Sequence, residues 1–342
     1  MLEFDTSTFI QSRSFMHKVE DTVCHLFDTQ RQSFLAKKTK AFSEYMQTLT
    51  SCCLDNCFVS FTGWHNPLSI QNLLAPHSKT HQEGGYFFRF NGKGICINPG
   101  NHFFERFTNA GFHLWHIDTV LVTSPDNRHL QDLELLYECN RALNQTLIAH
   151  GQDPHVIEYL LHPQAYSQYS AKLRPFFRQE KESITCLETF DSYEQLQICD
   201  DIALVYKNSA HCIPCRFELQ NGLTFGYSAT GKDLELFTPC KMIITQYSDT
   251  VGSTPFTNAE LVLLSEFSLS DGDTRLEAAK QCRIYQRNAT VLPLENGIEI
   301  SLEHLGVRQN RAHSFHIPRQ SVQIVREMDF QRLIYTSNGQ TL

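Results

Sequence analysis

IDTVLVTSPDNRHLQDLE, residues 117–134, is the stretch that decides the fold. Residues 117–122 are mainly apolar, which is typical of a strand buried on both faces of a sheet. The polar residues 123–129 predict a loop. From Leu130 onward apolar residues recur every three or four positions, which predicts a long helix that ends near Gly151. A buried strand, a polar loop and a helix in this order are typical of an α/β protein.

Outward from this stretch, strand-like runs alternate with helical ones. Asn91-Gly92 is a strong hairpin signal between strands that we expect at 86–90 and 94–98. Further strands are expected at 202–206, 215–219, 223–227, 242–245, 261–267 and 298–302, and further helices at 101–110 and 274–287. Because strands and helices are mixed in both halves of the chain, the sequence predicts a layered α/β sandwich.

The N-terminal segment has a different pattern. Residues 15–49 contain no Gly or Pro, and their apolar residues recur at spacings near three and four, which predicts a helix. These apolar residues are Met16, Val19, Val23, Leu26, Phe27, Phe34, Leu35, Phe42, Tyr45 and Met46. We expect this helix to pack on the core or on a partner. The predicted domains are an N-terminal helical extension (1–50), a main domain (51–316) and a C-terminal tail (317–342).

The composition limits the class of protein. Of the 342 residues, 41% are hydrophobic and 19% charged, which is typical of a globular chain, and the 25 Phe predict an aromatic-rich core. The net charge of -8 argues against general nucleic-acid binding, which needs cationic charge. The sequence shows no signal-peptide pattern and no apolar run near the ~20 residues of a membrane span. We therefore expect the 12 scattered Cys to be reduced, in a cytoplasmic protein without a membrane partner.

Three segments together resemble the metallo-β-lactamase superfamily, particularly its bacterial hydrolases and ribonuclease-Z-like branch. GGYFFRFNGKGICINPG (84–100) resembles the family's strand, hairpin, strand and Asp-Pro-Gly turn. Residues 117–134 resemble the strand that delivers the metal-binding loop, with the helix that follows. CRFELQNGLTFGYSATG (215–231) resembles the hairpin that ends in a Gly-Tyr-Thr-x-Asp-Thr-Gly turn, and residues 260–282 also fit. The resemblance covers about residues 56–305 and implies a four-layer αββα sandwich with an N-terminal helical extension.

The metal-binding loop of the family reads Thr-His-x-His-x-Asp-His, and its side chains hold one or two Zn²⁺ ions. When Thr123 is placed on the motif's Thr, Ser124 replaces the first His. Asp126 then replaces the second His and Arg128 replaces the Asp, so that only His129 matches. A fixed cation in place of an anionic ligand would repel a divalent metal. We expect Arg128 to pair with Asp126 or with a nearby carboxylate.

Other positions of the family pattern are altered as well. Asn98 replaces the usual Asp of the turn, and Ala229 stands where a bridging Asp would lie, unless the register shifts by one residue. His211 is a candidate for a further His, although the alignment of its SAHCIPC stretch stays open. Residues 246–256, where a final His would follow a strand, contain none. The resemblance with these departures implies no conventional zinc centre and no other cofactor. If a zinc ion does bind, its expected ligands are Asp126, His129 and His211.

Two groups of cysteines offer another metal candidate. Cys212 and Cys215 form a Cys-x-x-Cys, and Cys52, Cys53 and Cys57 form a second group. Zinc needs about four ligands, so a site would have to combine both groups. We expect ordinary buried thiols instead. A thioredoxin-like role is disfavoured, because that motif opens a helix whereas Cys215 begins an expected strand.

Three interpretations of function stay open. The favoured one is a pseudoenzyme of this fold that acts as a non-catalytic structural or regulatory subunit of a protein complex. By analogy with diverged members of the family, such complexes include bacterial anti-phage defence systems. The alternative is a diverged metal-dependent phosphodiesterase or nuclease-type hydrolase, so the sequence leans away from an enzyme without deciding the question. In the third, the cleft binds a nucleotide or another anion on Arg128.

Overall fold

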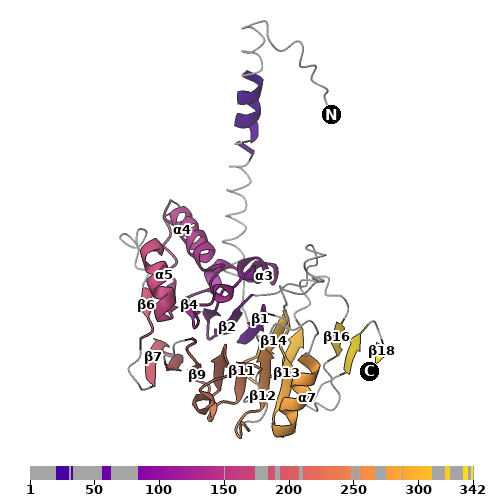
Figure 1. Cartoon of the computed structure of the whole chain (residues 1–342). Coiled ribbons are helices and arrows are strands. Elements are labelled where there is room, and N and C mark those ends of the chain that lie inside the picture. The colour runs from indigo at the N-terminus through magenta and orange to yellow at the C-terminus, as the bar shows by residue number, and fades with distance from the viewer. Residues whose placement is uncertain are drawn as a thin grey trace. The chain divides into compact units, whose positions relative to one another are not determined.

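The computed structural model of this chain describes residues 21–30, 32–33, 56–62, 84–149, 151–173, 184–188, 193–207, 211–247, 251, 255–265, 275–286, 288–309, 320–323, 334–337 and 340–341. The chain divides into two compact units, Met1–Cys53 and Leu54–Leu342. In the first unit, residues 21–30 and 32–33 are helical (indigo in Figure 1). The helix predicted over 15–49 is confirmed at these residues, and the rest of that range lies outside the described residues.

Two large mixed sheets form the centre of the second unit (Figure 1). As far as the structure describes the chain, the first sheet has eight strands in the order β15-β14-β1-β2-β3-β4-β5-β6. These are β1 (Cys57–Ser60), β2 (Tyr86–Phe90), β3 (Lys93–Ile97), β4 (Thr119–Val122), β5 (Glu158–Leu161), β6 (Ile184–Cys186), β14 (Ile298–Ser301) and β15 (Val307–Gln309). Neighbouring strands from β3 to β6 are parallel, and the other pairs are antiparallel.

The second sheet has seven strands among the described residues, in the order β13-β12-β11-β10-β9-β8-β7. These are β7 (Glu194–Cys199), β8 (Ile202–Tyr206), β9 (Cys215–Leu219), β10 (Thr224–Ser228), β11 (Met242–Gln246), β12 (Leu261–Ser265) and β13 (Thr290–Pro293). The strands from β10 to β13 pair in parallel, whereas those from β7 to β10 pair antiparallel. A small sheet near the C-terminus joins β16 (Gln320–Gln323), β17 (Ile334–Ser337) and β18 (Gln340–Thr341).

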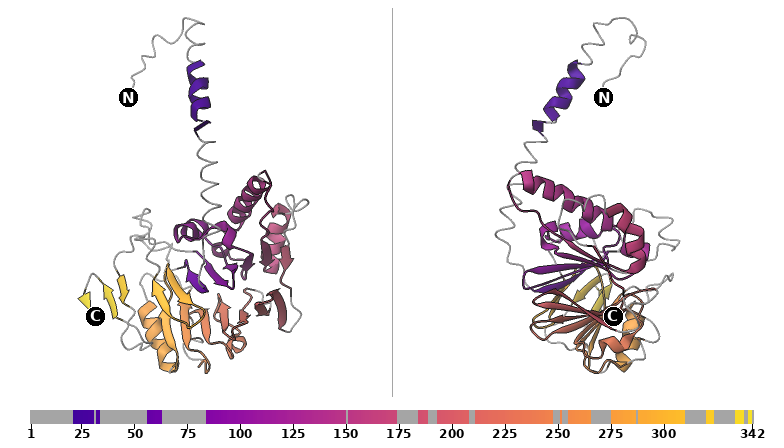
Figure 2. Two further views of the ribbon diagram at one scale, coloured as in Figure 1. Left: turned by 180° about the vertical axis from the view of Figure 1, so that it is seen from behind. Right: turned by 90° about the vertical axis from the view of Figure 1, so that its left-hand side faces the viewer.

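Helices cover the outer faces of the two large sheets, which pack against each other (Figure 2). The helices are α3 (Phe103–Asn109), α4 (Leu133–Ala149), α5 (Pro163–Leu173) and α7 (Arg275–Tyr285), with 3-10 turns η2 (Leu114–His116), η3 (Asn127–His129) and η5 (Leu234–Phe237). The buried apolar side chains accordingly fall into three clusters. One lies between the sheets, one under α3, α4 and α5, and one under α7 and η5. The second unit is therefore an αββα sandwich, as predicted.

Strand β2 shows how both faces of a sheet are filled. Tyr86 and Phe88 lie in the cluster between the sheets, whereas Phe87 lies in the cluster beneath the helices. Phe88 packs edge-on against Phe217 and Phe225 of the opposite sheet, at ring distances of 4.9 and 5.0 Å. Because successive side chains of a strand point to opposite faces, a strand covered on both sides must be apolar throughout.

The predicted elements are present with small shifts. The Asn91-Gly92 hairpin is confirmed, and both residues have positive φ, 47° and 84°, as a two-residue hairpin turn of this type requires. The loop predicted at 123–129 contains the 3-10 turn η3, so that α4 starts at Leu133. Within the described part of the chain, no helix is both long and apolar enough to span a membrane.

Candidate functional site

The candidate site lies where β4 ends. Because β3, β4 and β5 are parallel, the residues that follow them meet at one edge of the sheet. The backbone N–H of His162, just after β5, donates to the Val122 carbonyl at 2.8 Å. The N–H of Ile213 donates to the Thr123 carbonyl at 2.7 Å. These bonds fix the segments around His162 and Ile213 beside the loop that follows β4.

A buried amide joins three strand ends beneath the site. Asn98, which follows β3, is 1% exposed and has a φ of 51°. Its Nδ2 donates to Thr123 Oγ1 at 2.9 Å and to the Tyr227 hydroxyl oxygen at 2.8 Å. Its Oδ1 accepts from the Thr123 backbone N–H at 2.8 Å. At the position where the resemblance implies an Asp, this chain therefore has a neutral amide used for structural hydrogen bonds.

Above this amide lies a cleft of about 400 Å³. All six residues singled out from the sequence line it: Ser124, Asp126, Arg128, His129, His211 and Ala229. The structure thus brings together two segments that are more than eighty positions apart in the sequence. The cleft also contains four residues that the sequence did not single out: Pro125, Gln164, Thr230 and Gln246.

Two of these missed residues lie at or shortly after the end of a strand. Gln164 lies in the first turn of α5, which begins directly after β5, and no strand was predicted at β5. Gln246 is the last residue of β11. This is the strand after which the family resemblance implies a final His. The position of Gln246 at the end of this strand could therefore have marked it as a cleft residue.

Arg128 and Asp126 form an ion pair inside the cleft. Arg128 Nε donates to Asp126 Oδ2 at 2.9 Å, and Arg128 Nη2 donates to the same oxygen at 2.7 Å. The other oxygen, Oδ1, accepts from the Arg128 backbone N–H at 3.0 Å, and so caps η3. The Asp126 backbone N–H in turn donates to Ser124 Oγ at 3.2 Å. Both oxygens of the carboxylate are therefore used by Arg128, as one of the sequence expectations anticipated.

The electrostatics of the pair follow from this geometry. Partial burial raises the pKa of Asp126, but the hydrogen bonds from the Arg128 side chain and backbone outweigh it. The charges of Arg128 and His129 act in the same direction, so the pKa of Asp126 lies below its ordinary value. Asp126 is thus an anion at neutral pH, held by a neighbouring cation.

The two histidines of the cleft differ in their surroundings. His129 is buried at 5% exposure, and its backbone N–H donates to the Asp126 carbonyl at 2.9 Å. His211 is exposed at the opposite wall, two residues before the Ile213 bond to Thr123. Ala229, at the position where a bridging carboxylate would lie, is buried and carries no ligand atom.

These side chains do not fit the family's dinuclear zinc centre. Two zinc ions need several imidazoles and carboxylates that are free to coordinate. The one carboxylate among the cleft residues, Asp126, already accepts three hydrogen bonds from Arg128, whose guanidinium would lie beside any bound cation. Across the described residues, no group of three or more His, Cys, Asp or Glu side chains could hold a metal ion.

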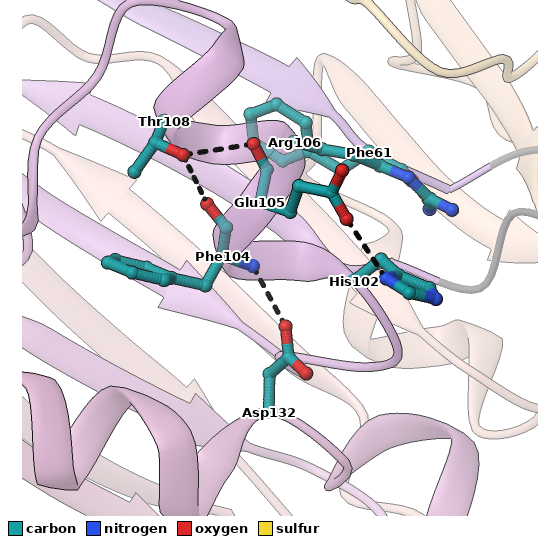
Figure 3. A network of polar contacts seen from close by, with 7 residues as sticks. All are labelled: Phe61, His102, Phe104, Glu105, Arg106, Thr108 and Asp132. Atoms are coloured by element: carbon teal, nitrogen blue, oxygen red, sulfur yellow. Dashed lines mark hydrogen bonds and ion pairs between the residues drawn. The ribbon is translucent and has the colours of Figure 1, made fainter. Parts of the chain in front are cut away.

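A second polar network lies close by in sequence, around the start of α3 (Figure 3). Asp132, three residues after His129, accepts from the Phe104 backbone N–H at 2.9 Å, and its own N–H donates to the Pro99 carbonyl at 3.1 Å. Burial raises the pKa of Asp132, and the bond from Phe104 lowers it only in part. Asp132 therefore ties the beginning of α4 to the turn after β3 and to α3, which is a structural role.

The described cysteines do not form a shared metal site. Cys57 lies in the cluster beneath the helices, whereas Cys212 and Cys215 lie in the cluster between the sheets. The first sheet separates these two clusters. Burial, together with the neighbouring Cys212 and Cys240, raises the pKa of the Cys215 thiol well above its ordinary value. Cys215 also begins β9, as expected. Cys52 and Cys53 lie outside the described residues.

Comparisons with known proteins address the fold. No family model and no curated protein matches the chain. Among solved structures, the metallo-β-lactamase fold protein YhfI from Bacillus subtilis is similar, with a TM-score of 0.54 and 12% identity over 72% of this chain and 99% of that one. The short form of human tRNase Z has a TM-score of 0.45 and 12% identity over 72% of this chain and 99% of its own. A diphosphatase of the PhnP family has a TM-score of 0.49 and 10% identity over 72% of this chain and 96% of its own.

The chain therefore has the metallo-β-lactamase fold. At identities this low the likeness concerns the fold alone. What this cleft does must be argued from its own residues.

Proposed function

We propose that this chain is a metallo-β-lactamase-fold protein that lacks the dinuclear zinc centre and acts as a non-catalytic structural or regulatory subunit of a protein complex. The observation that carries the proposal is the Arg128–Asp126 ion pair in the cleft. A guanidinium keeps its charge at any physiological pH, because its pKa is above about 12. A zinc ion bound to Asp126 would have to displace this cation and would then be repelled by it.

The outer surface of the second unit suits a partner. Leu135 and Ile148 of α4 are 46% and 55% exposed, and Val156, in the segment after α4, is 40% exposed. Leu135 and Ile148 lie 13 positions apart on α4, so these are separate exposed apolar side chains, each of which a partner could cover. This surface supports a role in a complex, and the anti-phage defence complexes that the resemblance implies are one such setting.

The proposal predicts that the metal site can be rebuilt. Ser124→His, Asp126→His and Arg128→Asp together restore the family motif around Thr123 and His129. We expect calorimetry to show about one bound zinc ion per chain for this triple variant, since three imidazoles and a carboxylate suit zinc. The parent chain should give no heat of zinc binding. Arg128→Lys is the matched control, which keeps the cation and should bind no zinc.

A diverged metal-dependent hydrolase is the second candidate, because Asp126, His129 and His211 line the same cleft. It predicts zinc or manganese in the purified parent chain at nearly one ion per chain, and loss of that metal with His129→Ala. This result would contradict the first proposal. If neither the parent chain nor the rebuilt variant bound zinc, the idea that the residues at positions 124, 126 and 128 are what prevents metal binding would be wrong.

Anion binding is a distinct use of the same cleft, since Arg128 is half-exposed there. A nucleotide or another anion on Arg128 would raise the thermal midpoint of the protein. Arg128→Glu should abolish that rise, and a rise that survives the substitution would exclude this use of Arg128.

A further inference from the structure

The helix of the first unit carries an apolar face that is open to solvent. All described residues of this helix are exposed, and Val23, Leu26 and Phe27 have exposed fractions of 43%, 55% and 66%. Residues three and four apart lie on one side of a helix, so these three side chains form one face. Burying a side chain of this size stabilises a protein by about 1.5–3 kcal/mol. A second surface that covers this apolar face would therefore stabilise the protein.

The sequence around this helix is nearly symmetric. Residues 15–20, 31 and 34–46 lie outside the described residues, so only their sequence is used. The apolar positions mirror each other about the midpoint between Gln30 and Arg31. The mirrored pairs are Phe27 with Phe34, Leu26 with Leu35, Val19 with Phe42, Met16 with Tyr45 and Phe15 with Met46. Val23 has Lys38 as its mirror position and is the exception. Two antiparallel copies of one helix related by a twofold axis place mirrored positions opposite each other.

The charges have the complementary arrangement. Before the midpoint, residues 15–30 contain the acidic Glu20, Asp21 and Asp28 and one basic residue, Lys18, so this half is net acidic. After it, residues 31–46 contain the basic Arg31, Lys37, Lys38 and Lys40 and one acidic residue, Glu44, so this half is net basic. In an antiparallel pair, the acidic half of one helix lies along the basic half of the other, so that Asp21 is opposite Lys40. In a parallel pair, each half would lie beside the same half of the partner, so that charges of the same sign would repel each other. The charges thus select an antiparallel second copy over a parallel one.

We propose that this chain dimerises through the helix of its first unit, which pairs in antiparallel direction with the same helix of a second copy of this chain. Val23, Leu26 and Phe27 lie in the contact, and the acidic and basic halves set the direction. The proposal does not depend on the cleft.

Charge reversal of the full-length chain tests the proposal. One variant carries Lys37→Glu, Lys38→Glu and Lys40→Glu, and a second carries Glu20→Lys, Asp21→Lys and Asp28→Lys. In sedimentation equilibrium at low salt, we expect the parent chain to be a dimer and each variant to have a dimer Kd at least about tenfold weaker, because several pairs worth ~0.3–0.5 kcal/mol each become repulsive. The chain with all six changes should dimerise like the parent, and an equal mixture of the two variants should form heterodimers.

A second pair of variants locates the contact. Leu26→Asp with Phe27→Asp should give a monomer, since it places charges in the apolar face. Gln32→Asp is the control, because Gln32 is exposed on the opposite side of the helix and should leave the dimer unchanged. The thermal midpoint of the second unit reports whether each variant is folded. A monomeric parent chain overturns the proposal, because the face is then covered within one chain or by another protein. A dimer that survives Leu26→Asp with Phe27→Asp, or one that ignores the charge reversals, also overturns it.

Discussion

Asn98 shows at the scale of one residue how a position at which the family resemblance implies the Asp of a turn serves the structure of this chain. The amide donates to Thr123 and Tyr227 and accepts from the Thr123 backbone, all within a buried environment. An amide both donates and accepts, whereas an ionised Asp only accepts. From the sequence, Asn98 was recognised as a departure from the family. Its partner Tyr227 could not be predicted, because it comes from the other sheet.

Asn98→Ala should lower the free energy of unfolding by about 3 kcal/mol. The substitution leaves buried groups of Thr123 and Tyr227 without a partner, and each such group costs about 1–3 kcal/mol. Urea denaturation measures the change. Tyr227→Phe, which removes one of these bonds, is the control and should cost about 1 kcal/mol. If Asn98→Ala were as stable as the parent, the amide would not hold the strand ends together.

Asp126 gives a prediction for pH. Its folded pKa is lowered, so its contribution to stability is present above the unfolded value of about 3.9 and is lost as the pH falls through the folded value. The pair is more than one-third exposed, and solvent screening limits its contribution to about 0.5 kcal/mol. Asp126→Asn should therefore be less stable than the parent by this amount at pH 5 to 7, and the difference should shrink below about pH 4. In urea denaturation, a difference that stayed constant down to acid pH would argue against the ion pair.

At the scale of elements, the predicted strands are those with long apolar runs or hairpin signals. β4 and the β2–β3 hairpin are of this kind, and they appear close to their predicted bounds. β5 was missed because only four residues, EYLL, form it and a histidine follows. The turn η3 was predicted as loop, since its order comes from the Asp126 cap and from contacts with a distant glycine. Local sequence thus predicts the elements, while tertiary contacts decide the geometry of the site.

That glycine is Gly100, and it allows η3 to approach the turn after β3. A Cβ at Gly100 would lie 2.1 Å from the Arg128 carbonyl oxygen and 2.4 Å from the Gly84 carbonyl oxygen. Because both atoms belong to the backbone, Gly100→Ala should force η3 to move and should cost about 2–3 kcal/mol in urea denaturation.

The control for Gly100→Ala is Gly222→Ala. A Cβ there meets nothing within 4 Å, but φ is 83°, so the cost should be about 1–2 kcal/mol. Equal stability of the Gly100→Ala variant and the parent would mean that η3 is not held against this turn.

At the scale of the whole molecule, the four layers are present although residues 124, 126 and 128 differ from the metal motif that the resemblance implies. The clusters on both faces of each sheet consist of apolar side chains, and Ala229 is the one of the six cleft residues that belongs to them. Loss of metal ligands therefore need not destabilise the sandwich. The six cleft residues named from the sequence could be identified because the family resemblance supplied their positions. The ion pair between Asp126 and Arg128 could be predicted because the two residues are only two positions apart in an expected loop.

Anomalous diffraction at the zinc edge, from crystals of the parent chain soaked in zinc, tests the central claim most directly. The account predicts no zinc peak in the cleft. It also predicts that Arg128 Nε and Nη2 still donate to Asp126 Oδ2, as in the present structure. A strong peak about 2.0–2.2 Å from a nitrogen of His129 and an oxygen of Asp126, with Arg128 turned away, would contradict it.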